Sequence, residues 1–171
     1  LGLEDYIILP ILGVDDFLTP QPFDGERITI DDNWLINSVR NNGVILTGRS
    51  SERLQALCQQ VGRVCLSYFD DEYQEKNAVP TAEGAIYLAM ENLPITINGA
   101  DSLVLGYGRC GRNLAQRLQA LGAHVTVATR SDAQRADAVA AGLNAVNFDE
   151  MIPFLAAADC IYNTVPKLIL E

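Results

Sequence analysis

The sequence predicts an α/β fold with a doubly wound parallel sheet, and three features support this prediction. Short apolar runs alternate with segments of helical periodicity, as expected when strands and helices alternate along a chain. Hydrophobic residues make up 49% and charged residues 20% of the 171 residues, which is typical of a packed core rather than of disorder. The glycine-rich segment LGYGRCG at 105–111 follows an apolar run and opens an amphipathic helix.

Residues 1–76 are predicted to form part of a smaller, flavodoxin-like α/β domain. Its elements alternate between strand and helix, beginning and ending with a strand, at 6–12, 31–43, 44–48, 50–62 and 63–69. Asp31 or Asp32 can cap the first helix and Gly43 can end it, while serines cap the second helix. The polar stretch 70–76 is then expected to be a linker.

Residues 77–99 are predicted to form an interdomain helix and linker, and residues 100–171 an incomplete nucleotide-binding domain. The interdomain helix covers 77–94, with a proline near its start. Beyond it, strands and helices alternate at 102–108, 109–122, 123–129, 131–142, 143–148, 149–158 and 159–166. Ser131 and Gln134 have the spacing of a capping box for the second of these helices.

The Gly-x-Gly-x-x-Gly segment predicts a Rossmann-type dinucleotide-binding turn, and its position between a strand and a helix makes it more specific than three glycines alone. The first glycine permits a tight turn, the second lets the backbone approach a pyrophosphate, and the third lets helix and strand pack closely. The helix N-terminus offers unpaired N–H groups to that anion. The predicted cofactor-binding residues of this turn are Gly106, Tyr107, Gly108, Arg109, Cys110 and Gly111.

The strand end at 128–131 predicts which dinucleotide binds. NAD sites of this type usually have a carboxylate about twenty residues beyond the glycine turn, where it holds the ribose hydroxyls. This chain has Thr129, Arg130 and Ser131 there, and its first acid is Asp132. An arginine can pair with a 2′-phosphate, and two hydroxyls can donate to it. These residues favour NADP over NAD; the alternative is a solvated turn followed by a simple helix cap.

Two further polar segments are candidates for the rest of the site. The last strand ends in a loop that is expected to flank the nicotinamide ribose, unless it only forms a turn: Asn163, Thr164, Val165 and Pro166. In the segment NAVPTAEG at 77–84, Asn77, Thr81 and Glu83 are the candidate catalytic residues, facing the nicotinamide from the cleft between the domains. Helix capping and the helix dipole alone are the other explanation for Thr81 and Glu83.

Charge and cysteine content argue against several classes of protein. The formal net charge is −10, so no basic face is available to bind nucleic acid. No apolar run is long enough to cross a bilayer. The four cysteines form no C-x-x-C pair, so we expect no disulfide, no bound metal and a reducing, cytoplasmic compartment.

These segments together resemble the family of dipicolinate synthase A subunits. The likeness is carried by the run from NAVPTAEG to VTVATRS at 77–131, then by GLNAVNFDE at 142–150 and IYNTVPKLIL at 161–170. It continues more loosely through EDYIILPILG and GVILTGRSSERL, so it extends over nearly the whole chain. The NAVPTAEG and NTVP segments are fairly specific to this family, whereas the glycine turn is shared with many dehydrogenases.

The resemblance implies a component of dipicolinate synthase that oxidises dihydrodipicolinate, a small cyclic dicarboxylate, to dipicolinate, with NADP as the hydride acceptor. It also implies a partner, the flavoprotein-like B subunit, together with a homo-oligomer and the cytoplasm of the mother cell in a sporulating bacterium. Because the family has further elements before and after the matched region, the chain looks truncated at both ends. The alternatives are a 2-hydroxyacid or alanine dehydrogenase relative, or a non-catalytic nucleotide-binding subunit.

Overall fold

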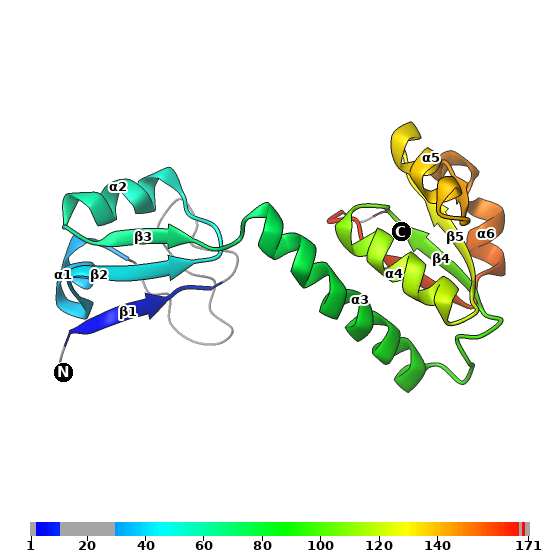
Figure 1. Ribbon diagram of the computed structural model, residues 1–171, viewed down its shortest axis with the longest axis horizontal. Coiled ribbons are helices and arrows are strands. Elements are labelled where there is room, and N and C mark those ends of the chain that lie inside the picture. The colour runs from blue at the N-terminus through cyan, green and yellow to red at the C-terminus, as the bar shows by residue number, and fades with distance from the viewer. Residues whose placement is uncertain (1–2, 11–29, 168, 170–171) are drawn as a thin grey trace. The chain divides into compact units, whose positions relative to one another are not determined.

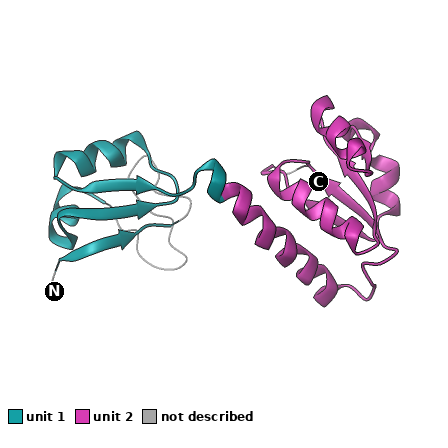
Figure 2. Ribbon diagram, in the orientation of Figure 1, with its two compact units in different colours: residues 1–73 teal, residues 74–171 magenta. Residues whose placement is uncertain are grey.

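The computed structural model describes residues 3–10, 30–167 and 169, and the chain divides into two compact units (Figure 2). Unit 1 comprises residues 1–73 and unit 2 residues 74–171. Each unit contains one parallel β-sheet with helices, so the predicted α/β class is confirmed. The limits of the predicted interdomain segment stay a prediction.

The described part of unit 1 is a three-stranded parallel sheet with two helices (Figure 1). Its strand order is β1-β2-β3. The elements in chain order are β1 (Glu4–Ile8), α1 (Asp32–Ser38), β2 (Val39–Thr47), α2 (Glu52–Gln60) and β3 (Val64–Ser67). Leu35, Ile45 and Leu54 are completely buried and form the core together with Cys58 of α2. The predicted order of strands and helices is therefore confirmed for these elements.

The first helix is shorter than predicted, and the strand after it is longer. The sequence pattern predicts a helix over 31–43, but α1 ends at Ser38 and Val39 begins β2 with extended backbone. The pairing of β2 with β1 shifts register in this part of the strand. Gly43 lies within β2, between the paired residues Val39 and Val44 where the register shifts, and not at a helix end. A Cβ on it would lie 2.5 Å from Val39 Cγ1.

A buried arginine supports the irregular start of β2. Arg63 is 8% exposed, and its Nε and one terminal nitrogen donate to the Val39 carbonyl at 3.1 and 2.6 Å. Its other terminal nitrogen donates to Asn41 Oδ1 at 2.8 Å and to the Val61 carbonyl. One guanidinium therefore satisfies several acceptors where the regular ladder is interrupted.

The long helix α3 (Asp71–Asn92) begins earlier than predicted. The prediction of a linker at 70–76 is therefore wrong, because most of these residues are helical. The Asp70 side chain accepts a hydrogen bond from the Tyr73 N–H at 2.7 Å. Two acidic residues follow in the first turn, where the helix dipole favours carboxylates. Pro80 lies inside the helix. Proline is tolerated best in the first turn of a helix, so the sequence pattern predicts a helix start near Pro80. The observed start lies earlier, at Asp71.

Unit 2 is a four-stranded parallel sheet of order β6-β5-β4-β7 with helices packed against it (Figure 1). After α3, its elements are β4 (Asp101–Leu105), α4 (Arg109–Ala120), β5 (His124–Ala128), α5 (Asp132–Ala140), β6 (Asn144–Val146), the 3₁₀ turn η1 (Phe148–Glu150), α6 (Ile152–Ala157) and β7 (Cys160–Asn163). The winding reverses between β4 and β7, which confirms the predicted doubly wound sheet. The carboxyl ends of its strands share one edge, where such sheets bind ligands.

Candidate functional site

Two glycines bring the turn after β4 into close contact with the first turn of α4. Gly106 has a φ of +92°, and a Cβ on it would lie 2.8 Å from Val165 Cγ2. A Cβ on Gly111 would lie 2.3 Å from the Gly106 carbonyl oxygen and 2.9 Å from Thr164 Oγ1. A larger side chain at either position would overlap with these atoms. The two glycines therefore allow α4, the turn after β4 and the loop at Thr164 and Val165 to pack closely.

Gly108 leaves open space beside the start of α4. It is the N-cap residue of this helix, and a Cβ placed on it would meet no atom within 4 Å. Because glycine has no side-chain oxygen, the first N–H groups of α4 have no side-chain cap. Uncapped N–H groups and the positive end of the helix dipole attract anions. The backbone at Gly108 is therefore accessible to an anionic group.

The side chain of Arg109 is held by α3. One of its terminal nitrogens donates to Gln74 Oε1 at 3.2 Å, and its Nε lies 3.5 Å from Glu75 Oε2. Glu75 also lies 3.7 Å from the guanidinium of Arg112. These contacts tie the first turn of α4 to α3 and hold the Arg109 side chain against that helix.

A cavity of about 330 Å³ lies at the carboxyl ends of β4 and β5. It brings together three of the predicted segments, which are the glycine turn, the residues after β5 and the loop after β7. The residues that line it are Gly106, Tyr107, Gly108, Thr129, Arg130, Ser131, Gln134, Phe148, Thr164, Val165 and Pro166. Tyr107 is 5% exposed, and burial raises its pKa, so its hydroxyl stays protonated.

Sequence reasoning missed two residues that line this cavity, Gln134 and Phe148. Gln134 lies in the first turn of α5, and the sequence pattern predicts only a capping role for it. Phe148 follows β6, whose carboxyl end lies at the same edge of the sheet as that of β5. Applying the strand-end rule to this third strand would have found Phe148.

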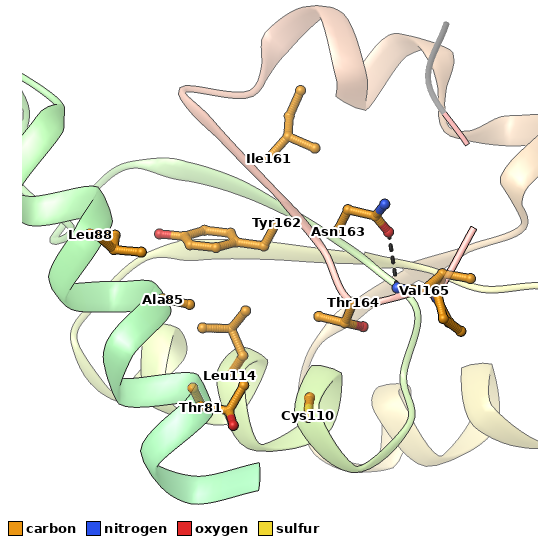
Figure 3. Close-up of a pocket in the computed structure, with 12 residues that line it drawn as sticks. Thr81, Ala85, Leu88, Cys110, Leu114, Ile161, Tyr162, Asn163, Thr164 and Val165 are labelled. Carbon is orange, nitrogen blue, oxygen red and sulfur yellow. Dashed lines mark hydrogen bonds between the residues drawn. The ribbon is translucent and has the colours of Figure 1, made fainter. Parts of the chain in front are cut away.

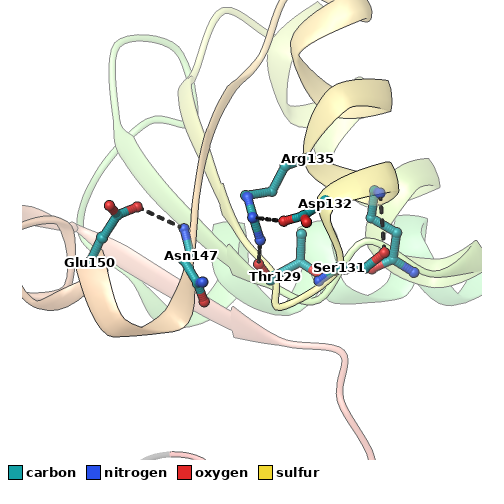
Figure 4. A network of polar contacts seen from close by, with 7 residues as sticks. Thr129, Ser131, Asp132, Arg135, Asn147 and Glu150 are labelled. Atoms are coloured by element: carbon teal, nitrogen blue, oxygen red, sulfur yellow. Dashed lines mark hydrogen bonds and ion pairs between the residues drawn. The ribbon is translucent and has the colours of Figure 1, made fainter.

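A network of hydrogen bonds orders the segment after β5 (Figure 4). Thr129 is 4% exposed and donates from its hydroxyl to Gln134 Oε1 at 2.7 Å, while Arg135 donates to the Thr129 carbonyl at 2.8 Å. Ser131 caps α5, because its Oγ accepts from the Gln134 N–H at 3.3 Å. The Gln134 side chain therefore bonds to Thr129 and not back to Ser131, unlike the predicted capping box.

The charged residues of this segment are held in different ways. Arg130 is exposed, and its guanidinium carbon lies 5.9 Å from the centre of the Phe148 ring. Asp132 forms an ion pair with Arg135 (Figure 4). No carboxylate lines the cavity among the residues that the structure describes. The cavity thus has a cationic side chain at one end, and the nearby acid is paired elsewhere.

The loop after β7 is fixed to the glycine turn. Thr164 donates its N–H and its hydroxyl to the Leu105 carbonyl, at 3.0 and 2.8 Å. Asn163 Oδ1 accepts from the Val165 N–H at 2.9 Å, which closes a local turn (Figure 3). This loop separates the first cavity from a second one, because three of its residues line both.

The second cavity has a volume of about 570 Å³ and lies between α3, α4 and β7 (Figure 3). Its lining is mostly apolar and consists of Thr81, Ala82, Ala85, Leu88, Cys110, Leu114, Ile161, Tyr162, Asn163, Thr164, Val165 and Pro166. Tyr162 is 8% exposed, and its ring extends from β7 toward Leu88 of α3. Burial raises the pKa of Tyr162, so this hydroxyl is also protonated.

The structure brings only one of the three candidate catalytic residues to a cavity. Thr81 lines the second cavity, and its hydroxyl donates to the Asn77 carbonyl at 2.7 Å. Glu83 Oε1 lies 3.8 Å from Arg117 Nε, and the Glu83 side chain is 65% exposed. Asn77 and Glu83 line neither cavity. Their catalytic roles stay a prediction.

Metal centres and membrane spans have no candidate in the described part of the chain. No group of three or more His, Cys, Asp or Glu side chains there could hold a metal ion. None of the described helices is long and apolar enough to cross a membrane.

Comparison with known proteins places these features in a family. Residues 67–168 match the NAD-binding domain of the D-isomer specific 2-hydroxyacid dehydrogenases. The chain is also 33% identical over 169 residues to the A subunit of dipicolinate synthase from Bacillus subtilis strain 168, across 98% of this chain and 57% of that protein.

Solved structures of dipicolinate synthase A subunits are also similar to this chain. The crystal structure of the dipicolinate synthase A subunit from Bacillus halodurans matches with a TM-score of 0.75 and 30% identity, over 96% of this chain and 57% of that one. The Bacillus subtilis structure matches with a TM-score of 0.72 and 32% identity, over 97% and 56%. A transhydrogenase from Sinorhizobium meliloti, at 13% identity and a TM-score of 0.64, shares the fold alone.

The resemblance to dipicolinate synthase A subunits is thus confirmed, and the chain spans a little more than half the length of these relatives. The family match includes the glycine turn, the residues after β5 and the loop after β7. It supports a nicotinamide dinucleotide as the cofactor. The chain belongs to the family of D-isomer specific 2-hydroxyacid dehydrogenase NAD-binding domains.

Proposed function

We propose that this chain is the nucleotide-binding part of a dipicolinate synthase A subunit, in which NADP takes a hydride from dihydrodipicolinate to give dipicolinate during sporulation. The observation that carries the nucleotide assignment is the cavity of about 330 Å³ that joins Gly108 to Arg130. The choice of reaction is supported by the identity of 33%, over nearly the whole chain, to the dipicolinate synthase A subunit of Bacillus subtilis.

The cavity fits a phosphorylated dinucleotide. The open space at Gly108 and the uncapped start of α4 suit the pyrophosphate. Arg130 and Ser131 line the same cavity and suit the 2′-phosphate, while Phe148, whose ring lies by the Arg130 guanidinium, lines the part of the cavity proposed for the adenosine. Thr129 acts through Gln134, because its hydroxyl is already donated to that side chain. Asp132, the nearest acid in sequence, does not line the cavity and forms an ion pair with Arg135, so no carboxylate of this segment faces the phosphate.

The loop after β7 and the second cavity are proposed to receive the other end of the dinucleotide and the substrate. When bound, the nicotinamide ring accepts a hydride from the substrate. The turn at Asn163 and Thr164 would position the nicotinamide ribose, and the apolar lining would exclude water. Because oxidation makes the substrate ring aromatic, the main task of the protein is to orient the reacting C–H bond.

Asn77, Thr81 and Glu83 are the proposed substrate-side residues. Asn77 and Thr81 would donate hydrogen bonds to a substrate carboxylate. Thr81 lies at the second cavity, but its hydroxyl must first leave the Asn77 carbonyl, to which it donates at 2.7 Å. Glu83 would act as the base. Because Glu83 lies 3.8 Å from the Arg117 guanidinium, it must leave this partner to take a proton.

The partners and the compartment belong to the same proposal. The protein would act with the flavoprotein-like B subunit of dipicolinate synthase, as a homo-oligomer, in the cytoplasm of the mother cell. The net charge of −10 supports a function without nucleic acid, since a basic surface is the usual requirement for binding a phosphate backbone.

Product formation tests the reaction. The whole A subunit containing this chain is mixed with NADP and a dihydrodipicolinate-generating system, with and without the B subunit, and NADPH is followed by its absorbance. The proposal predicts NADPH formation together with an equal amount of dipicolinate. A complex that binds NADPH but forms neither product would remove the proposed reaction while leaving the nucleotide site intact.

Two other functions remain candidates, each favoured by one observation. The family match favours a dehydrogenase for 2-hydroxy acids, and oxidation of such an acid by the same preparation would support it. A non-catalytic, nucleotide-binding subunit is favoured because no carboxylate or histidine lines either cavity among the described residues. Turnover by the isolated B subunit at the rate of the complex would support that alternative.

A further inference from the structure

Gln134 of α5 has a side-chain amide whose orientation is fixed by a buried hydroxyl. Thr129 is 4% exposed, and its Oγ1 accepts a hydrogen bond from the Ser131 N–H at 3.4 Å. The Thr129 hydroxyl donates in turn to Gln134 Oε1 at 2.7 Å. Because the amide oxygen is engaged by Thr129, the N–H donors of Gln134 Nε2 lie on the opposite side of the amide, away from that hydroxyl.

These N–H donors of Gln134 are available to a ligand. The residue is half-buried and lines the cavity of about 330 Å³ together with Arg130 and Ser131. Its amide oxygen bonds to Thr129 and its backbone N–H to Ser131, and Nε2 has no partner among the residues that the structure describes. Gln134 can therefore donate to a group in this cavity without breaking a contact within the protein.

The polar side chains at this end of the cavity suit a group that only accepts hydrogen bonds. An arginine side chain such as Arg130 has N–H donors and no acceptor. The Ser131 oxygen already accepts from the Gln134 N–H at 3.3 Å, so its hydroxyl proton remains for a ligand. A phosphate offers several acceptor oxygens, whereas a free ribose hydroxyl also donates and needs an acceptor in the protein. These side chains therefore match a 2′-phosphate better than a free 2′-hydroxyl.

We propose that Gln134 is a specificity-determining residue of the proposed NADP site, where its Nε2 donates to the 2′-phosphate while Thr129 holds the amide in place. The inference rests on the proposed function, and it adds a second element to the choice between NADP and NAD. Arg130 contributes a charge on an exposed side chain, whereas Gln134 contributes a fixed donor direction and no charge. Thr129 is a positioning residue, because its hydroxyl proton is committed to Gln134 and not to the ligand.

Gln134→Glu tests the inference, because it keeps the shape of the side chain and removes its donors. The carboxylate still accepts from the Thr129 hydroxyl, but it repels a phosphate and can accept from ribose hydroxyls. In calorimetric titrations of the whole A subunit that contains this chain, we expect the Kd for NADPH to rise at least about tenfold and the Kd for NADH to stay the same or fall. Gln116→Glu is the matched control on α4, at an exposed residue that does not line the cavity, and should bind both dinucleotides as the parent does.

Two variants of Thr129 test how the amide is held. Thr129→Val keeps the size of the side chain but releases the amide, so the Kd for NADPH should rise about threefold while the Kd for NADH is unchanged. Thr129→Ser keeps the hydroxyl and should bind NADPH as the parent does. The inference is overturned if Gln134→Glu changes both affinities by the same factor or neither, or if Thr129→Ser binds NADPH as weakly as Thr129→Val. A parent without preference for NADPH would instead overturn the proposed NADP function, and this inference with it.

Discussion

The close packing of the glycine turn against α4 can be tested with Gly111→Ala. The new Cβ would lie 2.3 Å from the Gly106 carbonyl oxygen and 2.9 Å from Thr164 Oγ1, where ordinary contacts begin at 3.4 Å. Overpacking of this kind costs about 3 kcal/mol. Displacing Thr164 from its 2.8 Å bond to Leu105 costs about 1 kcal/mol more. Alanine regains about 1 kcal/mol of helix propensity, so unit 2 should lose about 3 kcal/mol.

Thermal unfolding followed by circular dichroism measures this loss. For a unit of roughly 100 residues, such a change lowers the melting temperature by roughly 12–24 °C. Gly84→Ala is the matched control, because Gly84 lies in α3 of the same unit and a Cβ on it meets no atom within 4 Å. It should raise the melting temperature. Unfolding of Gly111→Ala within about 2 °C of the parent would refute the packing argument.

Three further substitutions test other parts of the structure. Arg63→Ala leaves the Val39 carbonyl without its buried donor and should lower the unfolding free energy in urea by about 3 kcal/mol; an unchanged midpoint would contradict this role. Ser102→Ala removes a hydroxyl that is 2% exposed and has no hydrogen-bond partner among the described residues, so stability should rise by about 1 kcal/mol, not fall. Arg135→Ala removes the ion-pair partner of the exposed Asp132 and should raise the Kd for NADPH about twofold in a fluorescence titration; an equal rise for NADH would argue against charge repulsion.

The sheet of unit 2 could be predicted because its signals are local and repeated. Each strand is a short apolar run, and each helix begins at a recognisable cap or glycine turn, as at Gly108 and Ser131. Parallel pairing then follows from the alternation of strands and helices. The same logic placed Thr129 and Arg130 at one cavity with the glycine turn, although about twenty residues separate them.

Contacts between distant residues could not be predicted in this way. The start of β2 at Val39 depends on Arg63, whose guanidinium donates two hydrogen bonds to the Val39 carbonyl. Gln134 has the spacing of a capping residue, but the Thr129 hydroxyl competes for its side chain. Glu83 is predicted from its segment to be a catalytic residue, yet its carboxylate lies beside Arg117 of α4. These side-chain contacts depend on tertiary packing, which a local sequence pattern does not indicate.

Binding of NADPH and NADH tests the central claim, which is that the glycine turn and Arg130 form an NADP site. Isothermal titration calorimetry compares the parent with Arg130→Asp, and Arg53→Asp in unit 1 makes the same charge change at a residue that does not line the cavity. We expect the parent and Arg53→Asp to bind NADPH at least about tenfold more tightly than NADH, and Arg130→Asp to lose this preference. Equal affinities for the two dinucleotides, unchanged by Arg130→Asp, would contradict the claim.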